Sequence, residues 1–148
     1  MIMNRRDALA SFALFADMLA SAGHAGAQPP AGAAPQAPVF KQDLPNVSLD
    51  GWEVTASHLN MPPGRVGAPH KHAGFVLVYV IEGSISAKVS GQGEEKTYTA
   101  GQMFYEQPGA THEVSKNASA TQPAKALAMI FAKKGATLTT QVPPAAVR

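Results

Sequence analysis

Apolar residues beyond residue 50 fall into short runs or alternate with polar ones, which is the pattern of β-strands. Residues 75–81 (FVLVYVI) are continuously apolar and rich in β-branched side chains, and Gly74 and Gly83 bound them, so they predict a buried strand. Residues 84–90 alternate with apolar positions on one face, which predicts the next strand. Further strands are expected at residues 52–60, 96–99, 103–106, 112–115 and 126–132, and one around 137–142 that would pair with a second subunit.

Many short strands separated by turns predict an all-β sandwich or small barrel. The 13 glycines and 12 prolines among 148 residues supply those turns, and the length suits one domain with extensions. The net charge of +2 and the scattered Lys and Arg residues argue against nucleic-acid binding. The chain contains no cysteine, which excludes disulfides and thiolate chemistry.

The first 27 residues have the features of a bacterial export signal. Arg5 and Arg6 precede an apolar stretch that reaches about residue 22, and Ala25-Gly26-Ala27 offers a cleavage site. The twin arginines favour the twin-arginine route, although Asp17 interrupts the apolar stretch. The alternative is a short amphipathic helix that opens a cytosolic protein. With a signal, we expect a periplasmic or secreted protein that is free of the membrane once the signal is removed.

The rest of the chain divides by composition. Residues 28–45 are rich in Pro, Ala and Gly and predict a flexible linker. The domain is expected at residues 46–134, and residues 135–148 form a polar, proline-bearing tail.

Two histidines lie one residue apart before the apolar strand. On a strand, His70 and His72 would point to the same face, with Lys71 on the other. Imidazole is the commonest metal ligand, so the pair is a candidate metal site. Two histidines on an exposed loop would give the same pattern, and the pair alone does not separate these alternatives.

The stretch 101–112 adds a second spaced set of glycines and a histidine. The chain resembles the cupins over about residues 52–132. The family's first motif is matched by Gly64, His70, His72 and Gly83, and its second by Gly101, Gly109 and His112. The proline and asparagine of the second motif stand one place late, at Pro108 and Asn117, with Gln107 and Lys116 at the family's positions.

The resemblance implies a small double-stranded β-helix, the cupin jelly-roll barrel, in a single domain. It also implies that His70, His72 and His112 converge on one divalent transition metal, which would be Fe, Mn, Ni, Cu or Zn. The family's fourth ligand is a glutamate, and its position here holds Val76.

Losing that carboxylate leaves three alternatives. Glu106 could complete the shell or act as the catalytic acid or base, although a glutamate at a strand end is ordinarily solvated and its face cannot be deduced across the following turn. Three histidines could instead hold a metal with an open position for hydroxide or an anionic substrate. The third alternative is a pocket without metal.

The function that follows is a metal-binding cupin acting on a small organic molecule, as a periplasmic enzyme of dioxygenase, isomerase or lyase type, with oxygenase chemistry favoured by the family. The alternatives are a non-catalytic cupin that binds or senses a small ligand, and a structural homodimer with a vestigial pocket. We expect a homodimer, because small cupins pair through edge strands. His58, Tyr79 and Tyr105 are weaker candidates for the pocket.

Overall fold

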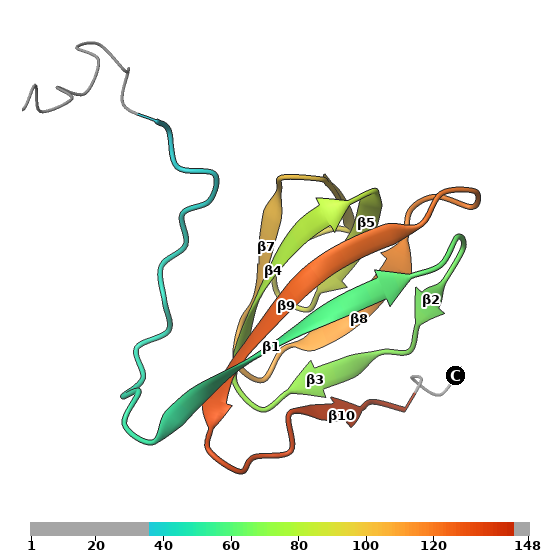
Figure 1. The fold of residues 1–148 in the computed structure, drawn as a ribbon. Coiled ribbons are helices and arrows are strands. Elements are labelled where there is room, and N and C mark those ends of the chain that lie inside the picture. Colours follow the sequence, from blue (N-terminus) through green and yellow to red (C-terminus); the bar gives the residue numbers. More distant parts are fainter. Residues whose placement is uncertain (1–35, 144–148) are drawn as a thin grey trace, which may run out of the picture. The chain divides into compact units, whose positions relative to one another are not determined.

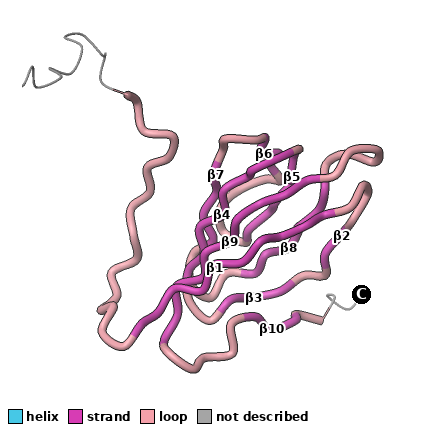
Figure 2. The backbone as a smooth tube through the Cα atoms, viewed as in Figure 1, coloured by secondary structure: helices cyan, strands magenta, loops and turns pink. Residues whose placement is uncertain are grey.

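The computed structural model describes residues 36–143, which form ten β-strands and, within that range, no helix (Figures 1 and 2). Among these residues there is accordingly no helix long and apolar enough to cross a membrane. The strands are β1 (Trp52–Met61), β2 (Val66–Gly67), β3 (His70–His72), β4 (Phe75–Glu82), β5 (Ser84–Val89), β6 (Lys96–Thr99), β7 (Met103–Glu106), β8 (Thr111–Asn117), β9 (Ala124–Lys133) and β10 (Thr139–Gln141). The predicted export signal and the first part of the predicted linker lie outside the described residues.

The strands form two antiparallel sheets. One has four strands in the order β1-β9-β4-β7, and the other has the order β10-β3-β8-β5-β6, with β2 also paired to β8. In Figure 1 the four-stranded sheet faces the strands of the second sheet across the domain. The sequence prediction of an all-β double-sheet jelly roll is therefore confirmed.

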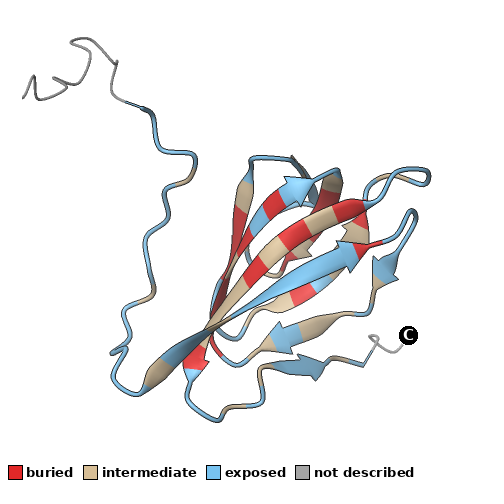
Figure 3. Cartoon of the chain, viewed as in Figure 1, coloured by how far each residue is buried: buried red, intermediate tan, exposed pale blue. Residues whose placement is uncertain are grey.

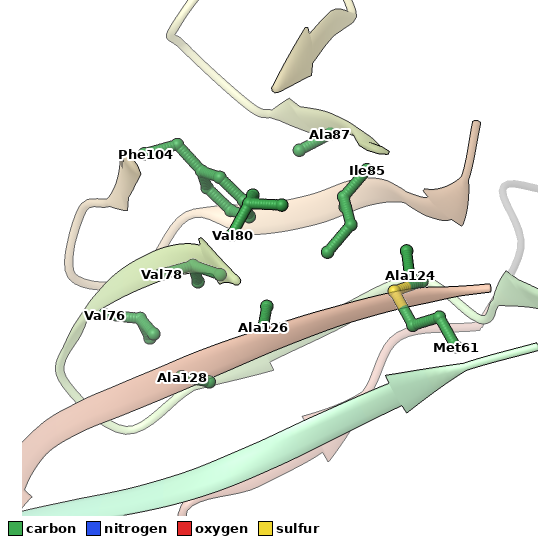
Figure 4. Packing of buried hydrophobic residues seen from close by; sticks show 10 residues of the cluster. All are labelled: Met61, Val76, Val78, Val80, Ile85, Ala87, Phe104, Ala124, Ala126 and Ala128. Carbon is green, nitrogen blue, oxygen red and sulfur yellow. The ribbon is translucent and has the colours of Figure 1, made fainter. Parts of the chain in front are cut away.

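The hydrophobic core lies between the sheets and is centred on β4. Val76, Val78 and Val80 point inward and are almost fully buried, whereas Tyr79 and Ile81 on the other face are partly exposed. The continuous apolar run is thus buried on one face rather than on both, and burial alternates along the strands (Figure 3). The core cluster consists of Met61, Val76, Val78, Val80, Ile85, Ala87, Phe104, Ala124, Ala126 and Ala128 (Figure 4).

A left-handed glycine ends β4. Gly83 has a φ of 69°, and a Cβ there would collide with the carbonyl of Pro123. Only glycine fits both demands, which is a physical reason for the glycine that closes the first motif.

The C-terminal strand has a partner within its own chain. The predicted strand around residues 137–142 exists as β10 and pairs with β3, while its pairing with a second subunit stays a prediction. Thr139 lies opposite His72, and Gln141 lies opposite His70. Strand β10 therefore covers the edge of the histidine-bearing strand. The edge strands of the described sheets are β1 and β7 in one and β10 and β6 in the other.

Candidate functional site

Three histidines come together where β3 and β8 pair. His70 lies directly opposite His112 in the antiparallel ladder, and His72 shares the inward face of β3 with His70. The ring centre of His70 is 4.9 Å from that of His72 and 5.0 Å from that of His112. The structure thus brings together the three histidines that the sequence singled out.

Backbone carbonyls fix the orientation of two of these rings. The Nδ1–H group of His70 donates to the carbonyl of Ala68 at 2.9 Å, and that of His72 donates to the carbonyl of Leu138 at 3.1 Å. A carbonyl can only accept, so in both rings the proton sits on Nδ1 and the lone pair on Nε2. A carbonyl bound to Nδ1 in this way fixes the ring and presents the Nε2 lone pair to a metal.

Glu106 faces the histidines, which settles the question that the sequence left open. Its side chain is 5% exposed, with Oε1 at 3.1 Å from His112 Nδ1 and Oε2 at 3.7 Å from His72 Nε2. Glu106 on β7 is the cross-strand partner of Val76 on β4. A buried carboxylate therefore lies at the level of Val76, on the neighbouring strand.

The electrostatics of the site favour neutral imidazole at His72. Burial lowers the pKa of His72 below its usual 6.5, while the carboxylate of Glu106 and the Leu138 carbonyl act in the opposite direction and the other two histidines lower the pKa further. Because the burial effect is the largest, the lone pair on Nε2 stays available near neutral pH.

The residues present fit a divalent transition metal. Ligand atoms of His70, His72 and Glu106 all lie within 4.8 Å of one another. His112 adds a buried Nε2 that has no hydrogen-bond partner among the described residues, and such an orphaned nitrogen is costly unless something binds it. Imidazole nitrogens and one carboxylate are the donors that Fe, Mn, Ni, Cu and Zn accept. The His70, His72 and Glu106 cluster could hold a metal, while the ligand set of three histidines stays a prediction.

A β-bulge explains the asparagine that stands one place late. Val89 pairs with His112 but Lys88 pairs with Val114, so Glu113 is an extra residue in β8. The extra residue shifts the side-chain alternation, and Asn117 points inward together with His112.

Asn117 is buried and holds two loops. Its Nδ2 lies 3.0, 3.1 and 2.8 Å from the carbonyl oxygens of Met61, Pro62 and Gln122, and its Oδ1 accepts the N–H of Ser119. The residue therefore holds together the loops at the end of the barrel remote from the Glu106 level.

A cavity of about 420 Å³ extends from the histidines between the two sheets. Its polar end is formed by the histidines, Glu106, Thr55 and Thr139, and its apolar wall by residues such as Val78, Ala128, Ile130 and Phe104. The volume lies within the range of small-molecule sites. Of the weaker candidates, His58, Tyr79 and Tyr105 do not belong to this lining, and His58 is exposed on a strand whose neighbours Ser57 and Leu59 line the cavity.

Comparison with known proteins agrees with this geometry. The family model described as a cupin domain matches residues 57–130, which is half of the chain. The chain belongs to the cupin family. No curated protein matches this cupin.

Solved structures support the fold alone, because identities are low. A conserved protein of Klebsiella pneumoniae with a double-stranded β-helix domain is 21% identical with a TM-score of 0.51, covering 62% of this cupin and 76% of that chain. A DMSP lyase of Ruegeria pomeroyi is 17% identical with a TM-score of 0.53, over 62% of this cupin and 44% of the lyase. Bacillus subtilis oxalate decarboxylase is 18% identical with a TM-score of 0.52, over 63% and 25%. This cupin therefore spans less than half of the lyase and a quarter of the decarboxylase.

Sequence reasoning missed the residues that contact the site from a distance along the chain. Leu138 and Thr139 reach His72 only because β10 pairs with β3, and both lie in the segment expected to be a tail. Arg65, which lines the cavity, carried no motif signal apart from its place next to Gly64. An alternating pattern around residues 137–142 was the only available hint of β10.

Proposed function

We propose that this cupin is an exported, metal-dependent enzyme that acts on a small organic molecule. The observation that carries the proposal is the buried carboxylate of Glu106, directed at the histidines and opposite Val76. A carboxylate enclosed in a cavity with three imidazoles is more than a structural core needs, because burying it costs free energy unless it is paired. The export signal in residues 1–27 supports a periplasmic or secreted location.

The residues would divide the work as follows. His70 and His72 would hold the metal through Nε2, and His112 and Glu106 are the further candidate ligands. When bound, the metal supplies polarisation of substrate oxygens, or open coordination positions for oxygen chemistry if it is redox-active. Glu106 either completes the shell or accepts a proton from the substrate, and Nδ1 of His112 lies 3.1 Å from its Oε1. The apolar wall excludes water from this exchange. The proposal includes dioxygenase, isomerase and lyase chemistry.

A non-catalytic cupin that binds or senses a small ligand is the second candidate. The observation that favours it is the largely apolar wall of the cavity beyond the polar end, which suits retention of a ligand as well as its conversion. The two candidates share the metal site and differ in whether Glu106 transfers a proton.

The test is the metal content of the purified full chain by mass spectrometry, beside His112→Ala, Glu106→Ala and the control His58→Ala. We expect about one divalent metal per chain in the parent and in the control, whose histidine is exposed outside the cavity. His112→Ala should lose the metal. A parent that binds none of Fe, Mn, Ni, Cu or Zn after reconstitution would contradict the enzyme as proposed.

A further inference from the structure

Arg65 lines the cavity at the end remote from Glu106. Its carbonyl accepts the N–H of Asn117, and Asn117 in turn lies opposite Ile85 on β5 and bonds the carbonyl of Met61. Met61 and Ile85 both line the cavity. Arg65 therefore lies at the level of Met61 on β1. Thr55 lies six residues earlier on β1 and pairs with Ile130, which in turn pairs with Val76 beside Glu106.

The cavity is consequently elongated. Six residues of extended strand span about 20 Å, with Glu106 and the histidines at one end and Arg65 at the other. Between these ends the inward side chains of the four-stranded sheet are apolar except for Ser57, with Val78 and Ala128 in the middle and Leu59 beyond them. Leu59 and Arg65 are exposed, so this end opens to solvent.

The two charged ends differ in how their charges are compensated. At the inner end, the carboxylate of Glu106 already lies beside the histidines, at 3.1 Å from His112 Nδ1 and 3.7 Å from His72 Nε2. At the outer end, the guanidinium of Arg65 has no carboxylate within 4.0 Å among residues 36–143. Guanidinium binds carboxylates through paired, charge-assisted hydrogen bonds.

We infer that the cavity takes an elongated organic acid whose carboxylate binds Arg65 and whose apolar body extends toward the histidines. The inference names the substrate class of the proposed enzyme and rests on the proposed function only for what happens at the inner end. It makes Arg65 a specificity-determining residue, which distinguishes an acid from a neutral molecule of the same shape.

The test uses octanoate as the probe and octan-1-ol as its neutral counterpart, titrated calorimetrically into the full chain with and without bound metal. Octanoate should bind more tightly than the alcohol, and its affinity should rise about threefold for each added methylene from butanoate to octanoate. Arg65→Gln should weaken octanoate binding about tenfold or more and leave the alcohol unchanged, because it removes a charge-assisted pair. Arg65→Lys should recover part of the loss.

The matched control is Lys71→Gln, which removes an exposed cation from the outer face of β3 and should leave octanoate binding unchanged. Equal losses in Arg65→Gln and Lys71→Gln, or equal binding of acid and alcohol, would overturn the inference. The metal analysis separates the two proposals. Arg65-dependent binding in a chain that holds no metal would support the acid site and contradict the enzyme. A metal-loaded chain that binds octanoate independently of Arg65 would contradict the acid site and support the metal-dependent enzyme.

Discussion

Val76 and Glu106 are direct partners across strands β4 and β7, both pointing into the cavity. The resemblance to cupins places the family's metal-binding glutamate at the position of Val76, and in this chain the buried carboxylate of Glu106 lies on the adjacent strand at the same level. Cross-strand partners have Cβ atoms about 5 Å apart. A carboxylate on either strand can therefore reach the same point, and one of the two positions is free to be apolar.

This relationship predicts that a carboxylate at position 76 can partly replace the one at position 106 in metal binding. Glu106→Val should lower the metal content of the full chain well below that of the parent, because it leaves the cation beside neutral imidazoles in an apolar cavity. The double variant Val76→Glu/Glu106→Val should regain part of the metal. Mass spectrometry after reconstitution with one chosen ion measures both. Full metal retention by Glu106→Val would show that the histidines suffice and would assign Glu106 to proton transfer alone.

The pH dependence of stability should depend on His72. Its pKa is lowered in the folded chain from the ordinary 6.5, chiefly by burial. Between that lowered pKa and 6.5 the unfolded chain binds more protons than the folded one, so stability rises with pH across this interval. The contribution is fully present above about pH 6.5 and is lost as the pH falls through the folded pKa.

Urea unfolding of the metal-free chain from about pH 5 to about pH 7.5 measures this dependence. His72→Gln should flatten the curve below about pH 6.5, whereas His58→Gln, which changes an exposed histidine, should follow the parent. If the two variants gave the same slope as the parent, His72 would not be the responsible group.

The sequence predicted the parts of this site that depend on local patterns. That His70 and His72 share one face, and that the apolar run after them forms a strand, could be predicted from the two-residue repeat of a strand alone. Strand β10 also lies where the pattern placed it, but its pairing with β3 was not predicted, because a local pattern does not indicate which sheet edge a strand will join. This pairing places the Leu138 carbonyl 3.1 Å from Nδ1 of His72.

The orientation of Glu106 and of Asn117 could not be predicted for a different reason. Each depends on a turn or bulge that changes side-chain parity, the turn at residues 107–109 and the extra Glu113 in β8. A one-residue change in register moves a side chain to the opposite face. The sequence shows that the motif asparagine is displaced by one position, but only the ladder of β5 and β8 shows that a bulge compensates for it.

Association through the free edge of the four-stranded sheet remains a prediction. Strand β1 ends that sheet and carries Val54, 54% exposed, on the face away from the cavity. An unpaired apolar edge favours pairing with a second copy. Val54→Lys should therefore shift the chain toward monomer in size-exclusion chromatography with light scattering. The control is Val66→Lys, which changes a more exposed valine on the two-residue strand β2 and should leave the oligomeric state unchanged. A monomeric parent at working concentration would contradict the expected homodimer.

Asn117 should be a major contributor to stability although it touches no ligand. Asn117→Ala removes the amide that lies between the carbonyls of Met61, Pro62 and Gln122, where the bond to Met61 is buried and the other two bonds are partly buried. At about 1 kcal/mol for each lost hydrogen bond, and more where a group is left unpaired, we expect roughly 2–4 kcal/mol in urea unfolding. Its neighbour Lys116 pairs with Glu95 at 2.8 Å on the surface, so Lys116→Ala should cost less than about 1 kcal/mol. Equal unfolding free energies of the two variants would contradict a major contribution of Asn117 to stability.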